Sequence, residues 1–189
     1  TSYTLPSGTG TFVIQNQLDT TSITARKIWE GDSDNAYGTR PVTGRTGGYT
    51  WEINLLVQYS TDLTTWTTLT TRDAAGTMHP VILHIYGDNA DSEGTVTLAG
   101  LPTHTLSGQE ITYRIRELRP DPDDNAWWYR PERTAAEAEA TIVGSNETFN
   151  DAYTASYPPN DNLTVTNRFG EGQTFHAVKT WIGPDRTAL

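Results

Sequence analysis

The sequence predicts an all-β protein with a β-sandwich architecture, and three observations support this prediction. Short runs rich in β-branched and aromatic residues alternate apolar with polar side chains, as strands with one buried face do. Threonine, a β-branched residue that suits solvent-facing strand positions, occurs 33 times. Turn-forming stretches separate the runs at intervals of about ten residues, and many short antiparallel strands of this kind are typical of a β-sandwich.

Nine runs are predicted as strands and one as a helix. In chain order, the strand runs span residues 12–17, 23–30, 49–59, 66–71, 81–86, 95–99, 111–118, 140–143 and 163–169. Turn-rich stretches lie between several of these runs, at 31–48, 87–94 and 120–126. The helix is expected over 134–140, where Thr134 and Glu137 have the spacing of a capping box.

Charge and composition exclude several classes of protein. The chain has 189 residues, and 23 acidic against 13 basic side chains give it a net charge of −10. Nucleic acids and anionic membrane surfaces need cationic partners, so neither is an expected partner. No apolar run approaches the roughly 18 residues of a membrane-spanning helix, so no membrane segment is expected in this fragment. The absence of cysteine excludes disulfides, a thiolate nucleophile and a Cys-ligated zinc site.

The two lysines of the chain, Lys27 and Lys179, lie in matching sequence contexts. Each has Ala two residues before it, Trp two residues after it and Gly four residues after it. A second match relates Asn16 to Asn167, and the two offsets, 152 and 151 residues, are nearly equal. Such coincident offsets indicate an internal repeat. The expected division of the chain is the tail of a preceding repeat or a linker over 1–18, a complete sandwich domain over 19–169, and a linker with the start of a following repeat over 170–189.

Strand alternation places one polar residue on each of three otherwise apolar strand faces. Lys27, Glu117 and Asn167 each alternate with apolar neighbours along their own predicted strand. A buried Lys or Glu is rare unless it is paired. Three such residues on three core strands therefore ask for a common explanation.

Two interpretations of these residues remain open at this point. In the first, Lys27 and Asn167 occupy edge positions from which their polar tips reach solvent. In the second, the three residues form a covalent amide in a dry core. A buried lysine loses its proton and becomes a nucleophile, while a buried glutamate stays protonated and polarises the Asn carboxamide.

The same residues carry a resemblance to a known family. The matching segments, in order, are 25–29 around Lys27, 100–102 (Gly, Leu, Pro), 111–117 ending in Glu117, and 165–167 ending in Asn167. Their order and spacing resemble the Cna B-type domain, a repeat of Gram-positive surface adhesins and pilins. The resemblance implies an inverse immunoglobulin-like β-sandwich in which Lys27 and Asn167 form an isopeptide bond and Glu117 catalyses its formation. The segment 72–89 has no counterpart in that pattern, which implies extra loops or strands.

The resemblance also implies a function and a location. The chain would be a structural stalk repeat of an extracellular protein attached to the bacterial cell wall, with neighbouring repeats of the same chain as its partners. Its single self-directed reaction would not make it an enzyme with turnover, and neither a cofactor nor a metal is expected.

Two alternatives use the same scaffold differently. A ligand-binding adhesin domain would recognise a host protein or glycan through Trp127, Trp128 and Tyr129, or through the long 31–48 loop. A calcium-dependent sandwich would use the acidic turns near residues 32–35, 88–93 and 121–124, although none of them has the complete EF-hand spacing.

The half-repeats at the two ends are expected to remain unreacted. Neither Asn16 nor Lys179 has its own glutamate strand in this sequence, and two strands alone bury too little surface to stay paired. We therefore expect a monomer.

Overall fold

The computed structural model describes residues 18–41, 49–119 and 133–170, and all structural statements below refer to these residues. It confirms the all-β prediction. The elements are β1 (Thr20–Glu30), the 3₁₀ turn η1 (Ser33–Asn35), β2 (Trp51–Ser60), β3 (Thr67–Thr68), β4 (Thr70–Arg72), β5 (Met78–Pro80), β6 (Ile82–Gly87), β7 (Glu93–Pro102), β8 (Thr112–Glu117), α1 (Ala135–Glu139), β9 (Thr148–Asn150), β10 (Tyr153–Ser156) and β11 (Thr164–Phe169).

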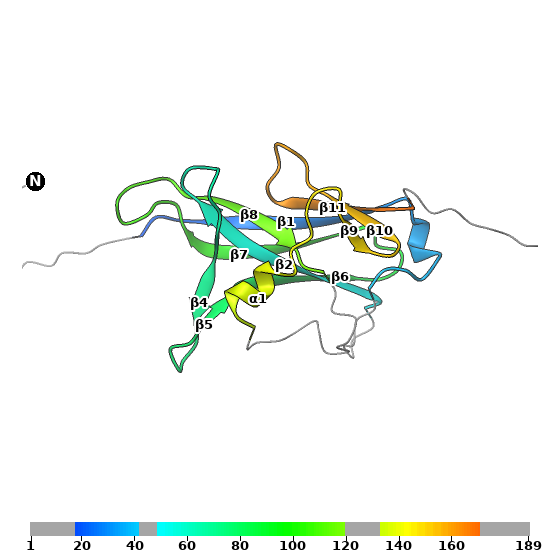
Figure 1. The fold of residues 1–189 in the computed structure, drawn as a ribbon, viewed down its shortest axis with the longest axis horizontal. Helices are drawn as coiled ribbons and strands as arrows, with labels where there is room; N and C mark the ends of the chain where they lie inside the picture. Colours follow the sequence, from blue (N-terminus) through cyan, green and yellow to red (C-terminus); the bar gives the residue numbers. More distant parts are fainter. Residues whose placement is uncertain (1–17, 42–48, 120–132, 171–189) are drawn as a thin grey trace, which may run out of the picture.

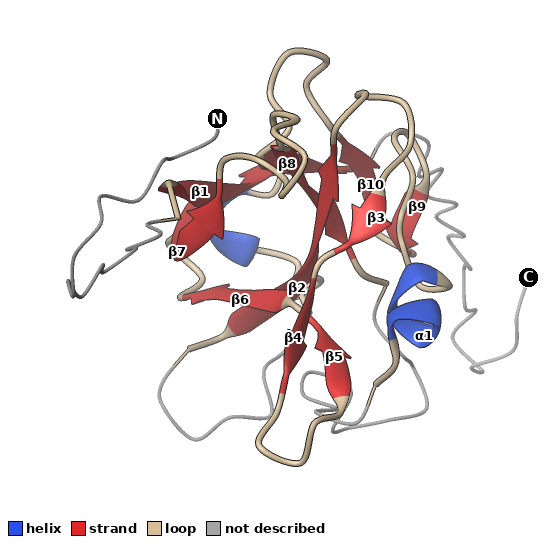
Figure 2. Ribbon diagram, turned by 90° about the vertical axis from the view of Figure 1, so that its left-hand side faces the viewer, coloured by secondary structure: helices blue, strands red, loops and turns tan. Residues whose placement is uncertain are grey.

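Two sheets pack in a sandwich-like arrangement (Figure 1, Figure 2). The first has five strands in the order β7-β1-β11-β10-β9. In the second, β2 pairs antiparallel with β3, β6 and β8. In the first sheet β1 runs antiparallel to β7 and parallel to β11, so the first and last described strands lie side by side.

The main core lies between the sheets and is built from their alternating inward residues. Ala25 and Trp29 of β1 are buried against Trp51 and Ile53 of β2, and Val165 of β11 lies in the same cluster. A second, smaller cluster covers the other face of β2, because Leu56 there contacts Leu118 and Ala138 of α1. The strand β2 is consequently buried on both faces, apart from half-buried Tyr59.

Most of the elements predicted within the described residues are confirmed, with some corrections, while the strand expected over 12–17 lies outside the described residues. The helix forms as α1, and Thr134 and Glu137 make both hydrogen bonds of the capping box. The strand predicted over 140–143 is wrong, because this segment follows the helix as a turn and makes only an isolated bridge from Ile142 to Leu118. The short strands β5, β9 and β10, of three or four residues, were not predicted.

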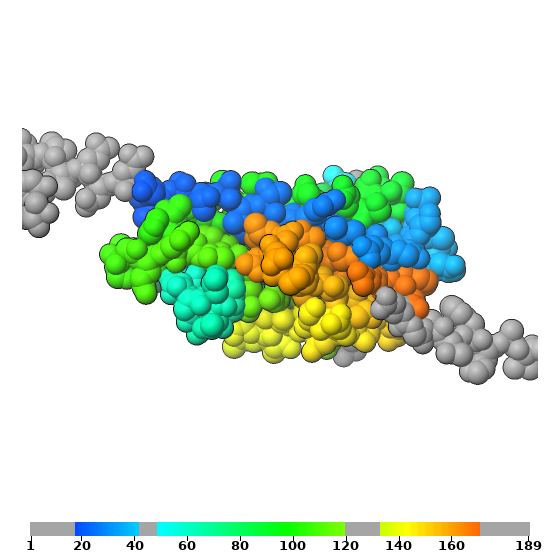
Figure 3. Space-filling model, turned by 90° about the horizontal axis from the view of Figure 1, so that it is seen from above, coloured from blue at the N-terminus to red at the C-terminus, as the bar shows by residue number. Residues whose placement is uncertain are grey.

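Because β1 and β11 are parallel, the described part of the chain begins at one end of the molecule and finishes at the other. Residue 18 precedes β1 at one end of the long axis, and residue 170 follows β11 at the other (Figure 1, Figure 3). Among the described residues, no helix has the length and apolar character needed to cross a membrane. The segment 72–89 supplies the strand β5 of the projecting β4–β5 hairpin, and then β6 of the second sheet.

Candidate functional site

The structure brings Lys27, Glu117 and Asn167 together in the core. Lys27 Nζ donates a hydrogen bond to Glu117 Oε1 at 2.8 Å, and Asn167 Nδ2 donates to the same oxygen at 3.2 Å. All three residues are completely inaccessible to solvent. The interpretation of Lys27 and Asn167 as edge residues with solvent-exposed tips is therefore wrong.

Strand register explains how three distant residues meet. On the parallel strands β1 and β11, Lys27 lies opposite Val165 and Asn167 lies opposite Trp29. Lys27 and Asn167 are thus diagonal neighbours two positions apart on the inward face of one sheet. Glu117 ends β8 in the other sheet, and its carboxylate reaches across the sandwich to both side chains.

Aromatic rings enclose the lysine amine. Lys27 Nζ lies 4.3 Å from the centroid of the Trp29 ring and 5.6 Å from that of Phe149. Both aromatic residues are almost fully buried. Because the rings exclude water, they strengthen every electrostatic interaction within the group.

Burial pushes the two ionisable groups of the site towards their neutral forms. It lowers the pKa of the Lys27 amine to about 8, although the neighbouring Glu117 carboxylate opposes this shift. It also raises the pKa of the Glu117 carboxyl, against the opposing charge and hydrogen bond of Lys27. In both groups the largest cause is the loss of hydration of the charged form. Burial therefore lowers the free-energy cost of transferring one proton from the amine to the carboxyl, relative to the same transfer in water.

Two oxygen atoms at the site have no hydrogen-bond partner, Glu117 Oε2 and Asn167 Oδ1. An unpaired buried polar atom is costly, and active sites are among the places where such atoms persist. A protonated Glu117 would donate to the carboxamide oxygen after a half-turn of the Asn167 amide, and this contact would polarise the Asn167 carbonyl.

A tyrosine that sequence reasoning missed holds the end of β8 in place. The Glu117 backbone N–H donates to the Tyr157 hydroxyl at 2.9 Å, and that hydroxyl donates to the Val143 carbonyl at 2.8 Å. Burial raises the pKa of Tyr157. Tyr157 follows β10 in a segment without a strand pattern, so no local signal in the sequence marked it.

A buried ion pair lies near Trp29. Arg40 Nε donates to Asp32 Oδ2 at 2.7 Å, and a second guanidinium nitrogen donates to Asp32 Oδ1 at 2.9 Å. The Tyr153 hydroxyl also donates to Asp32. The guanidinium lies 5.3 Å from the centroid of the Trp29 ring, and Lys27 Nζ contacts the same ring.

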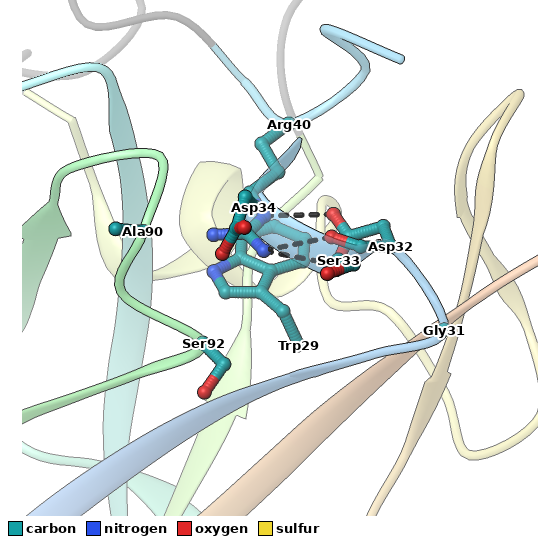
Figure 4. A pocket seen from close by; sticks show the side chains of 8 residues that line it. All are labelled: Trp29, Gly31, Asp32, Ser33, Asp34, Arg40, Ala90 and Ser92. Carbon is teal, nitrogen blue, oxygen red and sulfur yellow. Dashed lines mark hydrogen bonds and ion pairs between the residues drawn. The ribbon is translucent and has the colours of Figure 1, made fainter. Parts of the chain in front are cut away.

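An open cavity adjoins this ion pair (Figure 4). It has a volume of about 500 Å³, and most of its lining comes from Trp29 and from residues of the predicted 31–48 loop, including Asp34 and Arg40. Trp29 Nε1 is buried and has no hydrogen-bond partner. Figure 4 shows this nitrogen on the side of the cavity nearer Ala90.

The remaining predictions about site residues concern other parts of the chain. Trp127, Trp128 and Tyr129, the predicted ligand patch, lie outside the described residues, as do Asn16 and Lys179. In the acidic turn near residue 32, the Asp32 carboxylate forms an ion pair with Arg40. Within the described ranges, no group of three His, Asp or Glu side chains is arranged to hold a metal ion.

No model of a known protein family matches the chain, and neither a curated protein nor a solved structure matches it.

Proposed function

We propose that Lys27 and Asn167 form an intramolecular isopeptide bond, and that the chain is a structural stalk repeat of a bacterial cell-surface adhesin or pilin of the Cna B type. One observation carries the proposal. A lysine, a glutamate and an asparagine on three strands share one carboxylate oxygen in a fully solvent-inaccessible site.

The proposed reaction is an amide exchange. With its proton transferred to Glu117, the neutral Lys27 Nζ attacks the Cγ atom of Asn167, while the protonated carboxyl polarises the carboxamide oxygen. The new C–N bond forms as the bond from Cγ to the original amide nitrogen breaks. Glu117 relays a proton from Nζ to the departing nitrogen, which leaves as ammonia. The carboxyl is regenerated, and no other reactant is needed.

The burial of the site supports a structural role in preference to turnover. The reacting atoms are closed to solvent, so no external substrate reaches them, and the product is part of the fold itself. The bond would join the first and last described strands and close a chain segment of about 140 residues. A cysteine-free domain would gain in this way the cross-link that other extracellular domains obtain from disulfides.

The assignment to the Cna B type, with its inverse immunoglobulin-like topology, rests on the sequence resemblance together with this geometry. The segments 25–29, 111–117 and 165–167, which carry the resemblance, are those that supply the three residues of the site. A Gram-positive cell-wall location follows from the same resemblance.

Intact mass spectrometry tests the proposal directly. The purified chain is expected to be lighter than its sequence mass by one ammonia, with a cross-linked peptide that joins Lys27 to Asn167. The variants Lys27→Ala and Glu117→Ala should have their full mass. Glu93→Ala, which removes an exposed carboxylate on β7, is the matched control and should keep the deficit. A full mass in the unmodified chain would overturn the proposal.

A second candidate function, ligand binding, is favoured by the cavity beside Trp29. The exposed Asp34, which lines this cavity, offers an acceptor to a hydroxyl-rich ligand such as a glycan. Asp34 also has a positive φ of 53°, a backbone conformation that is costly for a residue other than glycine. A glycan array probed with the chain and with Asp34→Ala would test it. Binding that Asp34→Ala abolishes would support this function, and binding unaffected by the change would place the ligand elsewhere.

A further inference from the structure

We infer that the two ends of the unit are complementary docking surfaces, and that the leucine-bearing end of each unit packs against the tyrosine-bearing end of the unit before it. The inference deepens the proposed tandem-repeat function and depends on it. It concerns which surfaces meet and which side chains make the contact.

The exposed large apolar residues are sorted by type along the long axis. The described part of the chain exposes seven of them: Leu18, Leu63 and Leu106, Tyr37, Tyr49 and Tyr86, and Met78. Leu106 is fully exposed, and Tyr37 is 66 % exposed. Large apolar side chains that remain in contact with water forgo the stabilisation that burial would give. Several of them at one end of a domain therefore mark an interaction surface.

Topology places the three leucines at one end, here called the leucine end. Leu18 precedes β1, which starts at that end. Since β7 runs antiparallel to β1, the β7–β8 loop with Leu106 returns to the same end. The strand β2 is antiparallel to β8 and so finishes there, which places Leu63 in the turn that follows. Figure 1 shows these segments together at the left of the molecule.

The same topology places the three tyrosines at the opposite end, the tyrosine end. Tyr37 follows β1, Tyr49 precedes β2, and Tyr86 lies near the end of β6, which is antiparallel to β2. The rings form two pairs. Tyr37 stacks on Phe169 with a centroid distance of 4.9 Å, and Tyr49 contacts Tyr86 at 4.3 Å.

The leucine end also has a groove that can receive a partner. Its volume is about 660 Å³, and its lining is mostly apolar. Leu18 and Leu106 line it from the exposed side, while Leu69, Ile111 and Tyr113 line it from the side of the core. The groove runs over the surface from the exposed leucines to α1, whose Ala135 and Glu139 also line it.

The repeat spacing indicates that one occupant, the preceding unit, fills the groove. Because Asn16 corresponds to Asn167, Leu18 corresponds to Phe169, the last residue of β11. Leu18 thus lies at the junction where the last strand of the preceding unit would end, and at this junction it already lines the groove. Only Asp19 separates it from the first residue of β1.

The connection at the other end is equally short. Because Lys179 corresponds to Lys27, residue 172 corresponds to Thr20, where β1 begins. Two residues therefore separate Phe169 from the first strand of the following unit, and the Cα atoms that flank them lie at most about 11 Å apart. This distance is comparable to the spacing of packed sheets, so consecutive units must touch.

Docking of this kind is compatible with a monomeric fragment. A short tether raises the effective concentration of the neighbouring end to the millimolar range or above, so a contact too weak to join separate molecules is still formed between consecutive units.

A chain in which residues 19–170 occur twice in tandem, with the rest unchanged, tests the inference. The chain is free of cysteine, so Ala36→Cys in the first copy and Ser107→Cys in the second provide two specific sites for spin labels. Both positions are exposed, one at each of the ends that should meet. Docking predicts one narrow distance distribution by pulsed electron paramagnetic resonance.

Three variants of the tandem chain identify the surfaces. Leu63→Ser with Leu106→Ser in the second copy, or Tyr37→Ser in the first copy, should broaden the distribution. Met78→Ser, which removes the exposed apolar side chain of the β4–β5 hairpin, is the matched control and should leave it narrow. A broad distribution in the parent tandem chain, or a narrow one that the leucine and tyrosine substitutions do not change, would overturn the inference.

The intact mass of the same samples keeps the two proposals apart. Loss of two ammonia molecules with a broad distance distribution would leave the isopeptide function standing and reject the docking. A full mass with a narrow distribution that responds to the substitutions would reject the bond and keep the docking.

Discussion

Lys27 Nζ and Glu117 Oε1 lie 2.8 Å apart, although the two residues belong to different sheets of the sandwich. Each would be strongly destabilising without the other, because an unpaired charge buried in a dry core costs several kcal/mol. The pair is therefore a constraint between the two sheets, whether or not the proposed bond forms. Asn167 adds an amide that shares the same oxygen, and the proposed bond depends on this third contact.

Removing the bond together with the buried carboxyl isolates the contribution of the bond to stability. The triple variant Lys27→Met, Glu117→Met and Asn167→Leu replaces the three side chains by apolar groups of similar size, so no buried charge is left without a partner. Its free energy of unfolding should fall by about 5 kcal/mol, by analogy with a disulfide that closes a loop of this length. The melting temperature should fall by roughly 10 to 20 °C in a calorimetric scan.

Glu117→Gln is the matched comparison for that triple variant. It should also prevent the bond, but it leaves Lys27 buried without its carboxylate partner, so it should melt below the triple variant. If the triple variant melted with the unmodified chain, the bond would contribute nothing to stability.

The rate of bond formation should depend on pH with a maximum. The reactive form needs a neutral amine and a protonated carboxyl, which requires that the pair hold a single proton. In acid both groups are protonated and the reaction should slow. Above about pH 8, the pKa to which burial lowers Lys27, the pair loses its last proton and the reaction should slow again.

Refolding of denatured, unreacted chain at a series of pH values, followed by mass spectrometry, measures this rate. A rate that continued to rise well above pH 10 would show that the amine attacks without help from the protonated Glu117.

A single backbone cut should not separate the chain into two pieces. Arg72 is exposed in the β4–β5 hairpin, between the two ends of the proposed bond. After limited trypsin treatment the unmodified chain, cut once between residues 28 and 166, should gain the mass of one water and run as one species on a denaturing gel. The same cut in the triple variant Lys27→Met, Glu117→Met and Asn167→Leu should release two fragments. Two fragments from both proteins would contradict the bond.

Arg40→Met should lower stability without preventing the bond. The substitution leaves Asp32 buried without its cationic partner. Breaking a buried ion pair in this way typically costs roughly 3–5 kcal/mol, so the free energy of unfolding should fall by about 4 kcal/mol. The reacting groups are untouched, so the mass should still show the loss of one ammonia. Arg40→Met combined with Asp32→Asn should recover part of the stability. A full mass in Arg40→Met would instead give the ion pair a part in the reaction.

The three residues of the site could be predicted from the sequence because strand alternation is a local pattern. Lys27, Glu117 and Asn167 each interrupt an apolar face with a period of two, and all three prove to be buried. Their mutual contact depends on strand order, which alternation does not specify. The resemblance to a known family supplied that step.

The surroundings of the site could not be predicted, because they come from loops and long-range pairs. Asp32 and Arg40 lie in a stretch that indicates only turns, yet they form a buried ion pair. Tyr157 lies beyond the end of a strand, and its hydroxyl bonds to backbone groups of two other segments. In the 140–143 segment β-forming residues are present, but the segment follows the capped helix as a turn and pairs only through the bridge from Ile142 to Leu118.

The parallel alignment of β1 with β11 also determines how the domain would respond to a pulling force. Tension applied through residues 18 and 170 would slide the two strands past each other, so their hydrogen bonds would be loaded together in shear and not broken one at a time. With the proposed bond in place, the load would pass from Lys27 directly to Asn167. Residues 28–166 would carry no tension, and the roughly 470 Å of extension that they could release, at about 3.4 Å per residue, would stay locked in the fold.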